Sequence, residues 1–146
     1  RNMVDMLKLV QKHYYQKDMG GSNSIKQVLP TVLNHSVFLE SKYRNPLGFG
    51  SHLIGKTIWQ KKDGKVQDPY KQLPPIYEDL DQTQDSYLDE KGNIRDGGAA
   101  LMAYSYLQFS DLDEERRQAI TKGLLRYCEL DTLAMVMIYE HWNSLK

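Results

Sequence analysis

Tyr127 and Asp131 are the two residues whose types and spacing suit catalysis. They lie four residues apart in a segment with helical periodicity, which places both side chains on one face of the helix, one turn apart. Apolar residues on that face, among them Leu124, Met135 and Ile138, predict that Asp131 lies at the centre of a buried stripe. An ionised carboxylate there must be paired, bind a cation or be protonated, because bare burial costs several kcal/mol.

This pair has two possible roles. A carboxylate suits a hard cation such as Mg²⁺ or Mn²⁺, and a phenol can position, or help to deprotonate, a water that attacks phosphorus. Alternatively, the Tyr127 hydroxyl is only a hydrogen-bond partner of Asp131, or an arginine pairs with the carboxylate, and the arrangement is structural. The residues alone leave both interpretations open.

The spacing is not specific by itself. Tyr-x-x-x-Asp occurs three times in the chain, against about one occurrence expected by chance. One copy precedes Gly20-Gly21, and another, Tyr77/Asp81, lies in a proline-bounded loop. Only the third copy combines a predicted helix with a predicted buried face, so context singles it out.

A second candidate site lies near the N-terminus. Ser22, Asn23, Ser24 and Lys26 surround the predicted start of a short helix, whose backbone amides and side chains can hold a nucleic-acid phosphate. The alternative is ordinary N-capping by the serines, with Lys26 as an exposed lysine. In the first case we expect nucleic acid, DNA or RNA, as the partner.

Composition excludes several kinds of site and protein. The single cysteine, Cys128, excludes an internal disulfide and a multi-cysteine metal site, and we expect it to be a buried helix residue. No apolar run approaches the roughly 20 residues of a membrane-spanning helix, and the start does not resemble a signal peptide. We therefore expect a cytoplasmic protein without a membrane partner.

The net charge is zero, but its distribution is uneven. Residues 1–72 hold 12 basic and 5 acidic residues, whereas residues 73–146 hold 7 basic and 14 acidic residues. Zero net charge argues against a protein that simply coats nucleic acid. Either the two halves attract each other and pack together, or a basic surface for a polyanion lies beside an acidic pocket for a cation.

We interpret residues 1–146 as one piece of a single domain, and three regions of it must position the candidate residues. Residues 1–42 predict helices, including one from Ile25 to about Leu29 that Pro30 ends or kinks. Residues 43–96 are punctuated by Gly and Pro and predict long loops with a small hairpin, in which residues 57–59 and 65–66 flank Lys62-Asp63-Gly64.

Residues 97–146 predict two helices. The first runs from Gly98 to about Phe109, and its alanines permit close approach of another helix. The second begins at Ser110 or Asp111 and runs to Trp142 or beyond. The expected fold is therefore mainly α, with a small β-hairpin and long loops.

Two resemblances extend this reading. The segment Leu124–Trp142, LLRYCELDTLAMVMIYEHW, resembles the third exonuclease motif of the DEDDy branch of the DnaQ-like, ribonuclease-H-like superfamily, which is Tyr-x-x-x-Asp on the last helix. Residues 21–30 (GSNSIKQVLP), 96–108 and 127–136 more closely resemble a bacterial family, domain of unknown function 2779, which often follows a RecB-like nuclease region. This second resemblance spans nearly the whole chain.

The resemblances imply that Asp131 binds metal and that Tyr127 orients the attacking water. The implied activity is 3′-5′ exonuclease hydrolysis of nucleic acid with Mg²⁺ or Mn²⁺, and the implied fold is the C-terminal portion of an α/β ribonuclease-H-like domain. The family's Asp-x-Glu motif on an opening strand is absent, and Arg1 is not an initiator methionine. We therefore expect a piece of a longer polypeptide that binds metal poorly and cuts nothing by itself.

Two other interpretations stay open. In one, the chain is a non-catalytic interaction or substrate-guiding module for an upstream RecB-like nuclease domain of the same polypeptide. In the other, it is a self-contained helical binding domain in which Tyr127 and Asp131 share only a structural hydrogen bond. An Asp-x-Glu in a hydrophobic strand before Arg1 would favour catalysis over the module.

Overall fold

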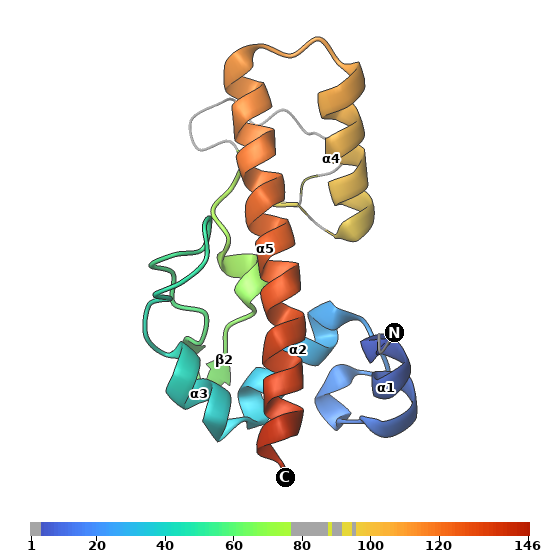
Figure 1. Ribbon diagram of the computed structural model, residues 1–146, viewed down its shortest axis with the longest axis vertical. Coiled ribbons are helices and arrows are strands. Elements are labelled where there is room, and N and C mark those ends of the chain that lie inside the picture. The colour runs from blue at the N-terminus through green and yellow to red at the C-terminus, as the bar shows by residue number, and fades with distance from the viewer. Residues whose placement is uncertain (1–3, 77–87, 89–91, 95) are drawn as a thin grey trace.

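The structure is a computed structural model that describes residues 4–76, 88, 92–94 and 96–146 (Figure 1). Its described part is mainly α, with five α-helices and one two-stranded antiparallel sheet, as expected. The helices are α1 (Met6–His13), α2 (Ile25–His35), α3 (Val37–Tyr43), α4 (Gly97–Phe109) and α5 (Glu114–Ser144). The strands are β1 (Lys61–Lys62) and β2 (Lys65–Val66), and short 3₁₀ turns η1 (Lys17–Met19) and η2 (Pro69–Gln72) complete the elements.

Helix α5 is the axis of the molecule. It lies along the longest dimension, with α4 beside its N-terminal half and α2 and α3 beside its C-terminal half (Figure 1). The helix begins later than predicted, because Asp113, and not Ser110 or Asp111, is the N-cap and accepts a hydrogen bond from the Arg116 N–H at 2.8 Å. In the described part of the chain, no helix is both long enough and apolar enough to span a membrane.

Helix α2 continues through Pro30, so the prediction that it ends near Leu29 is wrong. Proline removes one intrahelical hydrogen bond, but the turn that follows buries Thr31, Val32 and Leu33, each at most 2% exposed. Burial of these side chains in the core offsets the lost hydrogen bond. Packing against another element therefore overrides the local preference of proline.

Helix α4 packs closely against α5, as its alanines predict. Asp96 caps its start by accepting a hydrogen bond from the Ala99 N–H at 2.8 Å. Ala99 and Ala103 are buried on the side that contacts α5, and Leu107 continues the same face. Small side chains at this spacing allow the two helix backbones to approach.

The predicted hairpin exists, but its first strand lies at residues 61–62 rather than 57–59. Asp63 and Gly64 form a two-residue turn with φ of 51° and 81°, in the left-handed region that the tight hairpin turn requires. Residues 57–59 do not form a strand and contact the core instead. Ile58 is buried, and the Trp59 indole donates a hydrogen bond to the Leu33 carbonyl at 3.0 Å.

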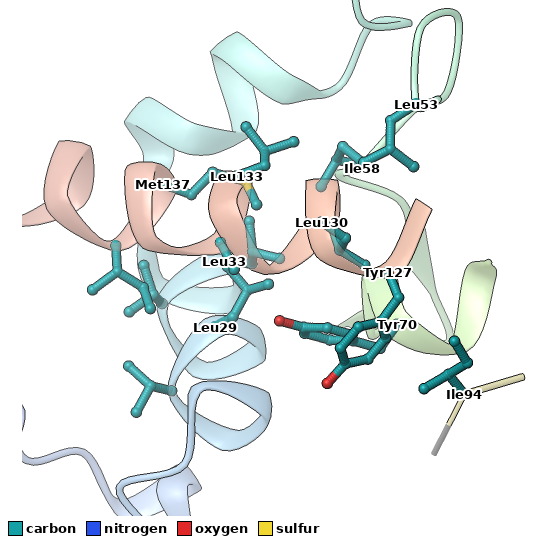
Figure 2. Close-up of a cluster of buried hydrophobic side chains, with 14 of the residues drawn as sticks. Leu29, Leu33, Leu53, Ile58, Tyr70, Ile94, Tyr127, Leu130, Leu133 and Met137 are labelled. Carbon is teal, nitrogen blue, oxygen red and sulfur yellow. The ribbon is translucent and has the colours of Figure 1, made fainter. Parts of the chain in front are cut away.

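The buried face of α5 is rotated by about 80° from the predicted one. The buried residues of α5 include Leu130, Leu133 and Met137, which meet Leu29 and Leu33 of α2 (Figure 2). Asp131 is half-buried at the edge of this face, not at its centre. Met135 and Cys128, which were expected to be buried, are exposed. The periodicity found an apolar stripe, but it could not show which side of that stripe α2, α3 and α4 cover.

The two halves of the chain interact, as one of the two charge explanations expects. Glu140 on α5 accepts a hydrogen bond from the Tyr43 hydroxyl at 2.8 Å and pairs with Lys42 at the end of α3. Burial, together with Glu140, raises the pKa of Tyr43, so its hydroxyl stays protonated. This cluster joins α3 to the C-terminal half of α5.

Glu129 fastens the loop after α3 to the middle of α5. Its carboxylate accepts hydrogen bonds from the backbone N–H groups of Ser51 (2.9 Å) and His52 (2.7 Å). Desolvation by burial acts to raise the pKa of Glu129, but hydrogen bonds from the backbone of His52, Ser51 and Leu53 outweigh it and lower the pKa. The ionised carboxylate of Glu129 therefore holds the loop at Ser51 and His52 in place.

Glu129→Gln is expected to lower the free energy of unfolding by about 2 kcal/mol at pH 7, because an amide nitrogen replaces one acceptor. The native pKa of Glu129 is lowered, so its stabilisation is complete above the unfolded-state pKa and is lost as pH falls through the native pKa. Urea unfolding from pH 7 to pH 3 checks this, and the difference between wild type and variant should shrink in acid. Glu115→Gln, an exposed glutamate on the same helix, is the control and should change stability by less than about 0.5 kcal/mol. A difference that stays constant with pH would contradict the assignment.

Candidate functional site

Asp131 lies between two tyrosine hydroxyls. The Tyr70 hydroxyl donates a hydrogen bond of 2.5 Å to Asp131 Oδ1, and Tyr127 lies close enough for the charge of Asp131 to raise the pKa of its hydroxyl. Tyr70 comes from η2, whose first turn is capped by Asp68 through the Tyr70 N–H. Tyr127 comes from α5, one turn before Asp131, as the spacing predicts. A loop and a helix thus converge on one carboxylate.

The two tyrosine rings form a small platform under a lysine. Their centroids lie 5.9 Å apart with the planes inclined by 51°, and Figure 2 shows the rings side by side below Leu130. Lys26 Nζ lies 4.7 Å from the centroid of Tyr70 and 5.0 Å from that of Tyr127. Contacts of this length are cation–π interactions. Lys26, a residue of the second candidate site, therefore lies beside Tyr127, a residue of the first candidate site.

Both phenols are strongly biased to their protonated form. Burial is the largest cause that raises the pKa of Tyr70, and the hydrogen bond and charge of Asp131 add to it. The pKa of Tyr127 is raised by burial and then by the charges of Asp131 and Asp96. A protonated phenol can donate a hydrogen bond and orient a ligand, but it does not remove a proton near neutral pH.

The residues described here do not make a metal site by themselves. Asp68 and Asp96 act electrostatically on the two tyrosines, but no group of three or more His, Cys, Asp or Glu in the described part of the chain is arranged to hold a metal ion. The carboxylate of Asp131 can serve as a Mg²⁺ or Mn²⁺ ligand, but a single carboxylate does not form a complete metal site. A metal at this position needs further carboxylates from outside the described residues.

The other predicted phosphate-binding residues do not join this cluster. Ser24 is the N-cap of α2 by position, but its side chain accepts no capping hydrogen bond. Ser22 Oγ accepts the Ser24 N–H at 3.2 Å, and Asn23 and Ser24 are exposed. Lys26 is half-buried rather than an exposed lysine, because its stem and ammonium follow the tyrosine rings. The binding role predicted for Ser22 and Ser24 stays a prediction.

The Tyr14/Asp18 copy of the Tyr-x-x-x-Asp spacing does not resemble this site. Tyr14 is half-buried and contacts His141 and Trp142, and Asp18 pairs with His35 at 3.1 Å. Tyr77/Asp81 lies outside the described residues.

Sequence reasoning missed Tyr70. It lies 61 positions from Asp131 inside the loop-rich region, where neither helical nor strand periodicity applies. The only local signal is Asp68-Pro69, which predicts a turn and not a direction for the tyrosine after it. Contact with α5 sets that direction.

Comparison of the chain with known protein families, with curated proteins and with solved structures gives no match. The geometry of the Tyr70–Tyr127–Asp131–Lys26 cluster therefore carries the functional argument.

Proposed function

We propose that this chain is the C-terminal part of a metal-dependent 3′-5′ exonuclease that acts on nucleic acid, and that it is inactive as an isolated piece. In this proposal a ribonuclease-H-like fold is completed by preceding segments of the same polypeptide. One observation carries the proposal: Asp131 is half-buried on α5, accepts a hydrogen bond from the Tyr70 hydroxyl, and lies one turn after Tyr127, whose pKa its charge raises.

The roles of the chain's own residues follow from their surroundings. Asp131 supplies one carboxylate ligand, held in place by the Tyr70 hydroxyl. Tyr127 orients a water and does not deprotonate it, because burial raises its pKa. The ammonium group of Lys26 lies beside Tyr127, where its positive charge would attract a phosphate group of the substrate. When bound, a divalent cation supplies Lewis-acid activation of water and phosphate.

Exposed apolar residues support the larger fold. Helix α5 carries four apolar residues that are each at least 43% exposed, Leu125, Met135, Val136 and Tyr139. Their spacing puts them on one face. An apolar stripe along a helix of this length is typical of an interface with another structural element. In the proposal, the preceding segments of the polypeptide cover it.

A second candidate is the non-catalytic module attached to an upstream nuclease domain. Two observations favour it: the Tyr70 hydroxyl already occupies Asp131 Oδ1, and the described residues form no group of three or more His, Cys, Asp or Glu that could hold a metal ion. In that case the cluster is a structural hydrogen-bond network, and the interface along α5 is the functional surface.

Nuclease assays on the full-length polypeptide test the proposal. We expect it to shorten 5′-labelled single-stranded DNA or RNA one nucleotide at a time from the 3′ end with Mn²⁺ or Mg²⁺, and to stop when EDTA is added. The 146-residue chain alone should show no cleavage and no tight site in a Mn²⁺ titration. Lack of activity on single- and double-stranded DNA and RNA with Mn²⁺ would favour the module instead.

A further inference from the structure

A polar cleft lies between the loop after α3, η2 and α5. Its volume is about 160 Å³, enough for a phosphate group with some of its water. The polar residues that line it are His52, Lys56, Thr57, Gln60, Gln72 and Arg126. They come from the loop after α3, from η2 and from α5, so three segments distant in the sequence build one site.

The cleft is positively charged. Lys56 and Arg126 face it together with His52, and no Asp or Glu is among its described lining residues. Glu129 acts electrostatically on His52, but its oxygens already accept backbone N–H groups of the same loop. The hairpin that follows Gln60 adds Lys61, Lys62 and Lys65, all exposed. Cationic and neutral hydrogen-bond donors without a lining carboxylate suit an anion.

The cleft is continuous with the face that carries Tyr127. Arg126, Leu73 and Pro74 line both the cleft and a smaller depression, and Tyr127 lines that depression too. Leu53, Ile58 and Leu130 are among the apolar residues that line the cleft. The cleft and the depression beside Tyr127 are therefore neighbours along α5.

We propose that this cleft binds the phosphate backbone of a single nucleic-acid strand, a few nucleotides from the end that Tyr127 and Asp131 act on. The identity of the anion rests on the proposed function, whereas the binding itself does not. Arg126 can hold a phosphate with two parallel hydrogen bonds, and Lys56 acts as a point charge. Groups of this kind contact phosphate and not base edges, so the site does not select sequence.

Binding of a fluorescein-labelled 12-nucleotide oligothymidylate to the full-length protein tests the cleft. The titrations use EDTA, so that no cleavage occurs and the result does not depend on metal. Lys56→Gln and Arg126→Gln are each expected to weaken binding about five- to tenfold at 150 mM salt. Each should also reduce the slope of log Kd against log salt by about 0.7, the value for one single-strand phosphate. Lys12→Gln, the same charge change on exposed α1, is the control and should leave both quantities unchanged.

Arg126→Lys keeps the charge and should restore most of the affinity, which a purely structural role of the arginine would not predict. Circular dichroism checks folding, and if Arg126→Gln does not fold, exposed Lys56 carries the test. Wild-type affinity in both cleft variants, an equal loss in Lys12→Gln, or no binding by the wild type would overturn the proposal. If the cleft variants lose affinity but the wild type cleaves nothing, the proposed exonuclease function is contradicted and phosphate binding by the cleft is supported. If the two cleft variants bind and cleave like the wild type, only the proposal that the cleft binds phosphate is contradicted.

Discussion

Asp131→Asn is expected to lower the exonuclease rate that we propose for the full-length protein by at least about a thousandfold, because in that proposal it removes one metal-ligating charge, worth several kcal/mol in the transition state. Asparagine has the same shape and keeps one acceptor oxygen for the Tyr70 hydroxyl. We therefore expect the free energy of unfolding to fall by less than about 1.5 kcal/mol. Single-turnover rates with a 5′-labelled oligonucleotide, together with urea unfolding, separate the loss of chemistry from the loss of fold.

The two tyrosines provide a matched pair of variants. Tyr127→Phe and Tyr70→Phe each remove one hydroxyl near Asp131 and keep the ring contact of 5.9 Å. Tyr127→Phe is expected to lower the rate about a hundredfold, because in the proposed mechanism Tyr127 orients the water. Tyr70→Phe only loosens the carboxylate, and the expected loss is less than about tenfold.

Three results would contradict this assignment. Asp131→Asn could retain the wild-type rate, which excludes the carboxylate as a ligand. The two phenylalanine variants could lose activity equally, which means that both tyrosines act only through Asp131. Alternatively, Asp131→Asn and Tyr70→Phe could destabilise the fold by the same amount without a change in rate, which identifies the cluster as a structural hydrogen-bond network.

The helices that could be predicted are those whose local signals agree with their packing. Helix α4 has a capping aspartate and small residues at helical spacing, and its observed start at Gly97 is one residue from the predicted one. Pro30 shows the opposite case, because the local signal ends α2 while burial of the next turn extends it. Local chemistry predicted where helices exist, and long-range packing decided where two of them end or begin.

The candidate site was predictable only in part, for a similar reason. The spacing of Tyr127 and Asp131 fixes their mutual position on α5, because both belong to one helix. Tyr70 and Lys26 reach the same carboxylate from other elements, and no periodicity connects residues so far apart in sequence. The burial of Asp131 was overestimated, because a helical wheel identifies an apolar stripe but not the elements that cover it.

The loop that carries His52 and Lys56 depends on a glycine, and Gly50→Ala is expected to lower the free energy of unfolding by about 3 kcal/mol. Gly50 has a φ of +97°, a conformation that side chains other than hydrogen disfavour. A Cβ at this position would lie 2.2 Å from Glu129 Oε1, the oxygen that accepts the Ser51 N–H. The substitution therefore strains the backbone and displaces the carboxylate that fastens the loop.

A double-mutant cycle separates these two causes. In a Glu129→Ala background the clash is absent, so Gly50→Ala should cost only the backbone strain, about 1–2 kcal/mol. Gly48→Ala in the same loop is the matched control, because its Cβ would meet no atom within 4 Å and its φ is not positive. Urea unfolding of the four proteins of the cycle and the control measures each quantity. Additive effects of Gly50→Ala and Glu129→Ala would show that the carboxylate does not contact this position.

The same variant connects the fold to the proposed cleft. If Glu129 positions the loop through Ser51 and His52, then Gly50→Ala should also displace His52 and Lys56 from the cleft and weaken oligonucleotide binding. Gly48→Ala should bind normally, and both measurements are made well below the urea midpoint so that unfolding does not contribute. Normal binding by a destabilised Gly50→Ala would mean that the loop keeps its place without the Glu129 carboxylate. In that case the charge of Lys56 and Arg126, and not the fastening of the loop, determines affinity.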